Sequence, residues 1–401
     1  MNTEMRASLD HCVKCTVCEA HCPVAAVTPL FPGPKYIGPQ GERFREAGTS
    51  VDISLDYCSS CGICTHVCPQ DVKIAEINSQ ARHEMKSKKG FSFRDRVISR
   101  PMVTGRLSAP VAPIANAVLH NKLARRVLSA TLGIHRNAPL PDSARTTLRR
   151  WLRGRPQAQP KRGTLIYFHG CAANFYEVET GRMTVEVLEH LGYRVLTPKQ
   201  GCCGLPLQSN GLFDDARRHV HSLVSALDGA GHGLPIVASS TSCGLMLKRE
   251  AHEILGIEDA TLASVGARTF DICEFLLDLH DHGELPLDFA PIEMTFPYHA
   301  PCQLRGHGIG TPAVELMKLI PGVTIVESNV ACCGVAGTYG LKREKYDVAM
   351  AVGAPLFSMV RDMHPPLAVC DSETCRWQIA TATGVETVHP IALIHRAYGL
   401  S

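Results

Sequence analysis

The cysteines constrain the fold of this 401-residue chain more than any other feature, because most of the 18 belong to repeated patterns. Eight lie within the first 80 residues, as two copies of one spacing that begin at Cys12 and Cys58. The other ten lie beyond residue 162. The polar N-terminus reaches cysteine before an apolar leader could form, so we expect reduced thiols that bind metal and no disulfide scaffold.

The N-terminal spacing predicts two [4Fe–4S] clusters with crossed ligands. In each copy, two residues separate each of the first three cysteines, and a fourth cysteine follows after three more residues, directly before a proline. The first three cysteines wrap one cluster, while the fourth points away and completes the other. One cluster is therefore expected on Cys12, Cys15, Cys18 and Cys68, and a second on Cys22, Cys58, Cys61 and Cys64. Structural zinc or disulfides would not require this pattern twice.

The ten C-terminal cysteines indicate a duplicated domain. One set recurs at offsets of 130 to 132 residues: Cys171, Cys202, Cys203 and Cys243 correspond to Cys302, Cys332, Cys333 and Cys375. In each copy an apolar run ends at the first cysteine, a helix-like segment follows, and a second apolar run leads into Cys-Cys-Gly. This order predicts a parallel sheet with covering helices, whose strand ends bring four thiols to one edge. Neighbouring thiolates suit a cluster or a redox thiol pair.

Four domains are expected along the chain. Residues 1–81 form an α+β, ferredoxin-type domain that is mostly helix and loop, with loop over the Pro/Gly-rich stretch 28–41. Residues 82–162 form a basic helical linker. Residues 163–285 and 286–401 form two α/β domains, each with one four-cysteine site. Cys273 and Cys370 are expected in the core, and His169 and His299 beside the sites, without a ligand role.

The linker carries a strong positive charge that the chain average hides. It holds 19 Lys and Arg against three acids, whereas the whole chain has a net charge of +3. Two stretches, 107–134 and 146–155, place Leu, Val and Trp151 at helical spacing beside arginines. A basic amphipathic helix favours an anionic membrane surface, with docking of an acidic partner subunit or a solvated linker as the alternatives. No reading motif favours nucleic acid, and no run of about 18 apolar residues predicts a membrane span.

These motifs resemble the cysteine-rich-domain family of iron–sulfur subunits, found in heterodisulfide reductases and glycolate oxidases. The resemblance is closest to the iron–sulfur subunits of anaerobic glycerol-3-phosphate dehydrogenases. It covers nearly the whole chain and rests on YFHGC (167–171), CCGLPL (202–207), ACCGVAGTYG (331–340), GAPLF (353–357), DSETCRWQI (371–379) and HPIALI (389–394). The resemblance implies an electron-transfer subunit, not catalytic alone, that passes electrons from flavoprotein partners to membrane quinone. It also implies a peripheral position on the cytoplasmic face of the inner membrane.

One departure bears on the paired-cysteine sites. Related sites in heterodisulfide reductase end in CxxC and use five cysteines, whereas Met246 and Gln378 stand here at the fifth position. Each site is therefore expected to hold an ordinary cluster, another metal or a dithiol. No full dinucleotide fingerprint is present, so FAD and NAD are expected on other chains. The alternative functions are an iron–sulfur subunit of a glycolate or lactate oxidase, or a thiol–disulfide oxidoreductase.

Overall fold

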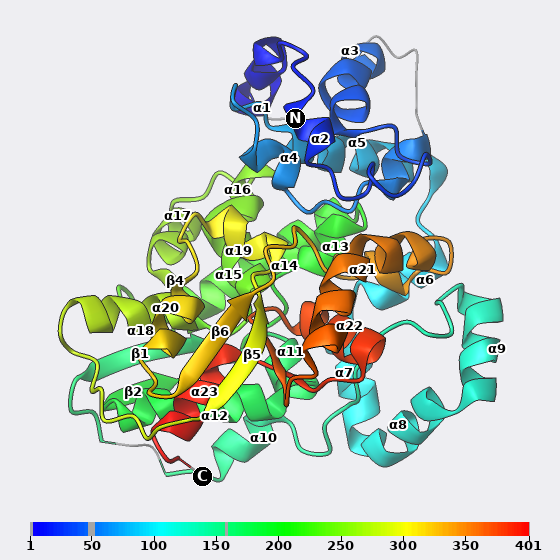
Figure 1. Ribbon diagram of the computed structural model, residues 1–401. Helices are drawn as coiled ribbons and strands as arrows, with labels where there is room; N and C mark the ends of the chain where they lie inside the picture. The colour runs from blue at the N-terminus through cyan, green and yellow to red at the C-terminus, as the bar shows by residue number, and fades with distance from the viewer. Residues whose placement is uncertain (1–2, 47–52, 157–158, 401) are drawn as a thin grey trace.

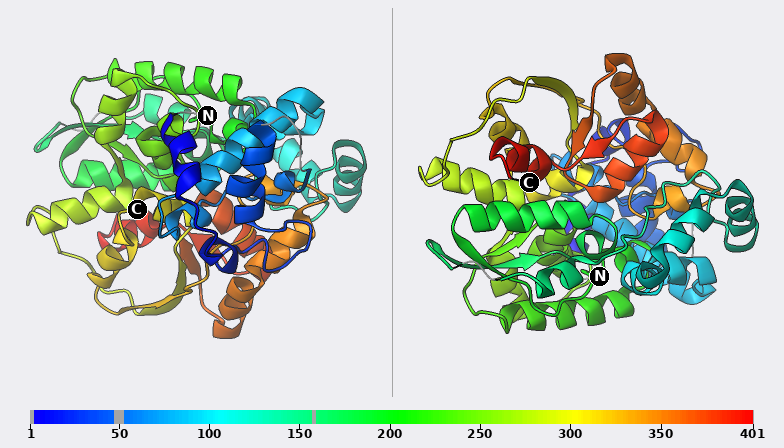
Figure 2. Two further views of the ribbon diagram at one scale, coloured as in Figure 1. Left: turned by 90° about the horizontal axis from the view of Figure 1, so that it is seen from above. Right: turned by 90° about the horizontal axis from the view of Figure 1, so that it is seen from below.

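Two α/β repeats carry a helical N-terminal domain on one end of the molecule (Figure 1). The computed structural model describes residues 3–46, 53–156 and 159–400. Seen from above, the N-terminal domain lies over the line along which the two repeats meet (Figure 2). The expected order of a two-cluster domain, a basic helical segment and duplicated α/β domains is confirmed.

Each repeat is built on a four-stranded parallel sheet. The first has the order β2-β1-β3-β4, and the second has the matching order β6-β5-β7-β8. The strands are β1 (Gly163–Phe168), β2 (Tyr193–Leu196), β3 (Ile236–Ala238), β4 (Thr269–Asp271), β5 (Met294–His299), β6 (Val323–Glu327), β7 (Ala368–Cys370) and β8 (Thr387–Val388). The central strands are short apolar runs buried on both faces, as parallel sheets require.

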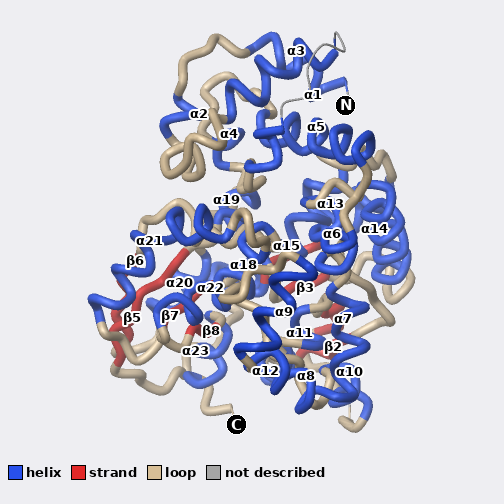
Figure 3. The backbone as a smooth tube through the Cα atoms, turned by 90° about the vertical axis from the view of Figure 1, so that its right-hand side faces the viewer, coloured by secondary structure: helices blue, strands red, loops and turns tan. Residues whose placement is uncertain are grey.

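Helices cover both faces of the two sheets (Figure 3). In the first repeat they are α11 (Ala172–Phe175), α12 (Val178–His190), α13 (Leu205–Ser209), α14 (Phe213–Asp228), α15 (Thr241–Leu245), η5 (Met246–Glu250), α16 (Ala251–Glu253), α17 (Ala260–Ala267) and α18 (Ile272–Asp281). In the second they are α19 (Cys302–His307), α20 (Pro312–Lys318), η6 (Tyr339–Leu341), α21 (Tyr346–Met363), α22 (Glu373–Thr383) and α23 (Pro390–Ala397).

The two repeats share one hydrophobic core. Helix α12 packs against α23, and its counterpart α20 packs against α18, so the same contact occurs twice with the roles of the repeats exchanged. Fully buried side chains from all four helices meet there, among them Val185, Leu276, Leu316 and Ile391. Each Å² of apolar surface buried between the repeats contributes about 25 cal/mol to stability, so this shared core stabilises one arrangement of the two repeats.

The N-terminal domain consists of helix and loop in its described residues. Its helices are α1 (Thr3–Ser8), η1 (Leu9–His11), α2 (Val17–Ala20), η2 (Tyr36–Gln40), α3 (Gly41–Glu46), η3 (Ile53–Tyr57), α4 (Ile63–His66) and α5 (Ile74–Lys89). The prediction of loop over 28–41 is wrong at its end. There η2 forms despite Pro39, with Ile37 buried and the Gly38 and Ile37 carbonyls accepting from Arg45.

The basic segment is helical, as expected, and its two amphipathic stretches lie in different environments. It contains α6 (Phe93–Ile98), α7 (Pro101–Ser108), η4 (Ala109–Val111), α8 (Ala112–His120), α9 (Lys122–Leu132) and α10 (Leu148–Arg153). Helices α8 and α9 stand at the side of the molecule (Figure 1). Helix α10 is amphipathic as expected, but it packs its apolar face on the core of the repeats through buried Leu148, so that face is not offered to a membrane. Within the described ranges, no helix has the length and apolarity that crossing a membrane requires.

Candidate iron–sulfur centres

The two N-terminal cysteine loops have the same backbone. Lys14 and Thr16 have positive φ angles of 58° and 68°, and the equivalent Ser60 and Gly62 have 58° and 77°. A short helix follows in each copy, α2 after Thr16 and α4 after Gly62. Only Gly62 adopts this conformation without strain. Three non-glycine residues held in the left-handed region indicate loops shaped for what their cysteines bind.

The first of the expected cysteine groups lies together. Cys12, Cys15, Cys18 and Cys68 line one small cavity at the surface of the N-terminal domain. Burial, followed by the nearby Glu19 and the three other thiols, raises the pKa of Cys18 to about 11. The backbone N–H of Val72 donates to Cys68 Sγ at 3.4 Å. This grouping is the crossed arrangement that the spacing predicts.

The second group lies on the side that faces the α/β repeats. Burial raises the pKa of Cys22 to about 11, with a smaller effect from Cys58, while the N–H of Ala25 donates to Cys22 Sγ at 3.5 Å and opposes that rise. Burial also raises the pKa of Cys64, and the electrostatic effects of Cys61, Cys58 and Cys22 add to it. The fourth cysteine of the first motif therefore lies with the first three of the second. The assignment of both groups as cluster ligands remains a prediction.

The four cysteines of the first repeat converge beyond the ends of β1 and β3. Cys203 Sγ and Cys243 Sγ are 3.4 Å apart, and Cys202 lies within hydrogen-bonding reach of Cys171. The N–H of Gly204 donates to Cys202 Sγ at 3.5 Å, and its φ of 89° turns the chain tightly around the site.

The second repeat builds the same arrangement from its own strand ends. Cys333 Sγ and Cys375 Sγ are 3.1 Å apart, and Cys302 is hydrogen-bonded to Cys332. Gly334 repeats the turn with φ 88° and donates to Cys332 Sγ at 3.3 Å. A Cβ at Gly334 would stand 1.9 Å from the carbonyl oxygen of Ala349, so glycine is required for the turn to pack on α21.

The electrostatics of the eight thiols fit a bound metal cluster. Hydrogen bonds from neighbouring thiols lower the pKa of Cys202 and of Cys332, while the same hydrogen bonds, followed by burial, raise the pKa of Cys171 and Cys302. Each crowded site thus favours one or two thiolates and opposes further ones. Bound iron would compensate the negative charge and would favour deprotonation of the remaining thiols. The donor set is therefore suited to an iron–sulfur cluster in each repeat.

The two sites differ in the groups that surround them. His299 offers a ring nitrogen within 4.8 Å of the Cys333 and Cys375 sulfurs, and after the Cys333 and Cys370 thiols it adds to the lowering of the Cys375 pKa. Cys370, at the end of β7, is fully buried in the core as expected, and it also lies within hydrogen-bonding reach of Cys375. In the first repeat Phe168 and Ala238 take these places, and His169 bonds the neighbouring Gly170 carbonyl.

No substitute for a fifth cysteine is found at the two positions that the sequence singled out. Met246 is buried in the core of the first repeat, and Gln378 donates to the sulfur of Met350. Cys273 is fully buried at the start of α18, as expected of a core residue, within 4.8 Å of Asp271 and Asp371.

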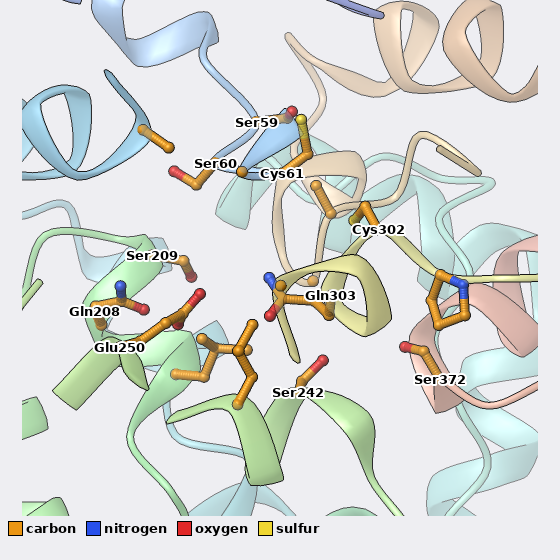
Figure 4. A pocket seen from close by; sticks show the side chains of 18 of the residues that line it. Ser59, Ser60, Cys61, Gln208, Ser209, Ser242, Glu250, Cys302, Gln303 and Ser372 are labelled. Atoms are coloured by element: carbon orange, nitrogen blue, oxygen red, sulfur yellow. The ribbon is translucent and has the colours of Figure 1, made fainter. Parts of the chain in front are cut away.

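One cavity of about 330 Å³ connects three of the four cysteine groups. Cys61 of the N-terminal domain lines it, together with both four-cysteine sites: Cys171, Cys202, Cys203, Cys243, Cys302, Cys332, Cys333 and Cys375. Figure 4 shows Cys61 and Cys302 on neighbouring walls of this space. The sequence predicts each group separately, but nothing in the spacing indicates that the groups share a cavity.

Comparison with known proteins agrees with this domain plan. The profile of the 4Fe-4S dicluster domain matches residues 8–72, and that of the cysteine-rich domain matches residues 165–248 and 296–380. A crystal structure of a hypothetical protein from Helicobacter pylori covers 100% of this chain and 74% of its own, with a TM-score of 0.54 and 10% identity. That likeness concerns the fold alone.

The chain is thus an iron–sulfur protein in which a dicluster domain precedes two cysteine-rich domains. One subunit of the anaerobic glycerol-3-phosphate dehydrogenase of Escherichia coli K12 is 39% identical over 398 residues, covering 97% of this chain and 98% of its own length. The chain belongs to the family of that subunit. One subunit of the fumarate reductase (CoM/CoB) of Methanothermobacter marburgensis is 29% identical over 53% of the chain and 41% of its own. Lactate utilization protein A of Geobacillus kaustophilus is 29% identical over 44% of the chain and 73% of its own.

Proposed function

We propose that this chain is the electron-transfer subunit of a quinone-linked glycerol-3-phosphate dehydrogenase. In this role it takes single electrons from a flavoprotein subunit, conducts them through the N-terminal clusters to the cysteine-rich domains, and delivers them to quinone. An iron–sulfur cluster supplies reversible one-electron transfer when bound. The substrate and the flavin are expected on partner chains.

The observation that carries this proposal is the contact between Cys61 and the second cysteine-rich site. Cys22 and Cys58 share one buried cluster with Cys302 and Cys332, and Cys61 packs against it. After burial, the Cys332 thiol is the strongest influence that raises the pKa of Cys61. Ligands of two centres in such proximity support electron transfer between them.

Buried polar contacts fix this junction. Arg82 is 4% exposed and donates to Ser60 Oγ at 2.7 Å, to the Cys58 carbonyl, and to the Ser209 carbonyl of the first repeat at 3.1 Å. On the other side, Lys345 of the second repeat lies 2.8 Å from Asp56. Although burial alone would raise it, the pKa of Asp56 is held well below its usual range by Lys345 and Lys86. The N-terminal domain is therefore bound to each repeat by a buried cationic side chain, Arg82 on one side and Lys345 on the other.

We further propose that α7, η4, α8 and α9 dock the protein on an anionic membrane surface. Aliphatic side chains that are 47 to 72% exposed follow one another along these helices: Val103, Leu107, Val111, Ile114, Val118, Leu123 and Val127. Arg106, Lys122 and Arg126 are exposed beside them, and no acidic residue occurs from Pro101 to Leu132. We call these ten residues the α7–α9 surface. Apolar insertion combined with cationic attraction is typical of peripheral binding to anionic lipid, and we place this surface on the cytoplasmic leaflet.

Two matched variants test the electron path. Cys203→Ser and Cys333→Ser each alter one cysteine-rich site, so in both variants the N-terminal clusters should still assemble and still be reduced by the flavoprotein. Quinone reduction should fall at least ~10-fold, equivalent to about 1.4 kcal/mol of barrier. Iron content and the melting temperature report whether each variant still folds. Wild-type quinone turnover in both variants would contradict a redox role for the cysteine-rich domains.

A further inference from the structure

One end of the shared cavity is lined by polar side chains without cysteine. Gln208 and Ser209 come from α13, Glu250 from the end of η5 and Gln303 from α19. In Figure 4, Gln208, Ser209 and Glu250 gather on one side, and Gln303 lies between them and Cys302. Both repeats contribute to this end, and the N-terminal domain closes the cavity with Ser59, Ser60 and Cys61.

Two oxygen atoms at this end have no partner. Glu250 Oε2 and Gln303 Oε1 are both shut off from solvent and make no hydrogen bond with the described residues. The Gln303 side chain lies close enough to Glu250 to lower the pKa of the Glu250 carboxyl slightly, so the two side chains face each other at this end. A buried polar atom without a partner costs about 1–3 kcal/mol, and such atoms in native proteins commonly mark a site that binds something else.

The surroundings of Glu250 favour its protonated form. Burial raises the pKa of Glu250 to about 8, and the carboxylates of Glu76 on α5 and Glu253 on α16 add to the rise. Arg249 opposes it but is itself bound to Glu253 at 2.9 Å and to the Gly306 carbonyl at 2.7 Å. Further charged groups line the cavity from the other elements: His66, Asp71, Lys73, Arg305 and Glu373. At neutral pH the Glu250 carboxyl is therefore held in its acid form, which can donate a hydrogen bond and a proton.

We propose that a quinone ring binds at this polar end, and that Glu250 is the catalytic acid that protonates it. The inference rests on the proposed function, since the electrons come from the flavoprotein's substrate through the clusters. One ring carbonyl oxygen accepts a hydrogen bond from Glu250. When the ring takes up two electrons, the O–H bond of Glu250 breaks and a ring O–H bond forms. A second proton enters from solvent along the polar lining, and solvent reprotonates Glu250.

Gln303 completes the binding geometry. Its free Oε1 accepts a hydrogen bond from the hydroxyl of the reduced ring, while its amide N–H holds the Glu250 carboxyl in position. This arrangement pairs both unpartnered oxygens in the reduced complex. The polar end of the cavity lies beside Cys61 and Cys302, so a quinone bound there is next to the junction of the N-terminal domain and the second repeat.

The test uses the complete complex with its clusters and partner dehydrogenase, and menadione as the quinone. Glu250→Gln keeps the shape of the acid but cannot give up a proton. It should lower kcat for menadione by about 100-fold, the lower range for loss of a positioned general acid, with cluster reduction unchanged. In the wild type, kcat should decline as the pH rises through about 8 because Glu250 loses its proton, and this decline should be absent in the variant.

Binding is measured separately from turnover. The probe is a fluorescent quinolone N-oxide, an analogue of the quinone ring. Its Kd should rise at least ~10-fold in Gln303→Met. The EPR signals of the clusters show whether this variant is folded. The matched control is Glu258→Gln, the same substitution at an exposed position. Wild-type kcat and pH profile in Glu250→Gln would overturn the inference while leaving the proposed function intact. A wild-type complex that reduces its clusters but no quinone would overturn the proposed function itself.

Discussion

At the scale of single residues, the N-terminal loops show how far spacing alone determines a site. The interval of two residues places three thiols on one loop, and the proline after the fourth cysteine turns the chain away. The structure adds the backbone cause, because Lys14 and Ser60 take the same left-handed conformation. It also groups Cys22 with the second motif and Cys68 with the first, as the crossed assignment requires.

Two serine variants test this crossed assignment against each other. Cys22→Ser should damage the cluster that Cys58, Cys61 and Cys64 hold, and Cys68→Ser should damage the other cluster, because each removes one thiolate from the partner motif's centre. Mössbauer and EPR spectra of both variants give the measurement. About four of the eight irons should be altered in each case. Loss of the Cys12-containing cluster in Cys22→Ser would show that the ligands are not crossed.

Residues outside the repeated pattern were less predictable. The sequence shows that His169 and His299 are shifted by one position relative to the cysteines that follow them, but not which of the two reaches its site. In the structure, His299 takes the place of Phe168 and reaches the second site, while His169 does not. The position of Cys370 is a similar case, because the end of β7 brings this residue close to Cys375. Such differences depend on strand register, which apolar runs buried on both faces specify only weakly.

At the scale of elements, hydrophobic periodicity predicted the helices of the basic segment but not their partners. Residues 107–134 and 146–155 have similar amphipathic patterns. Yet Leu148 is fully buried, and Trp151 packs on the same core with Arg155 over its ring at 4.5 Å. An amphipathic helix covers whatever apolar surface is available, and here the repeats supply one for α10 but none for most of α8 and α9.

The α7–α9 surface gives a prediction that separates apolar insertion from charge. Replacing Leu107, Ile114 and Val118 by serine should weaken binding to anionic vesicles at least ~10-fold, since about 2 kcal/mol is lost for each aliphatic side chain that would be buried in lipid. High salt should release much of the wild-type protein from the vesicles. The Debye length is ~8 Å at physiological salt and becomes shorter as salt is added, which screens the attraction. Vesicle co-sedimentation measures both effects.

The control for that experiment is Leu287→Ser, which alters an aliphatic side chain with 55% exposure away from these helices. It should bind vesicles as the wild type does. Equal binding of the wild type to neutral and anionic vesicles would contradict an electrostatic contribution, and unchanged binding of the triple variant would assign the surface to a partner protein.

At the scale of the whole molecule, the arrangement of the domains was the part that the sequence left open. The offsets of 130 to 132 residues predicted two like domains, and the spacing predicted two clusters, but neither predicts which surfaces meet. That depends on contacts between residues far apart in the chain, such as Arg82 with Ser209 and Lys345 with Asp56. The consequence is an asymmetric molecule: Cys61 is close to Cys332 and Cys302 of the second repeat, so the duplicated sites cannot be equivalent electron acceptors.

This asymmetry predicts an order of electron transfer, from the Cys61-containing cluster first to the second repeat. The donor sets of both cysteine-rich sites are suited to iron–sulfur clusters. A paramagnetic cluster in the second repeat should then broaden the EPR signal of the Cys61-containing cluster in the reduced protein. Cys333→Ser should narrow the signal by perturbing the neighbouring centre, whereas Cys203→Ser, the matched change in the first repeat, should leave it nearly unchanged. Power-saturation measurements at low temperature quantify the coupling. Equal narrowing in both variants would mean that the two repeats accept electrons from the N-terminal domain alike.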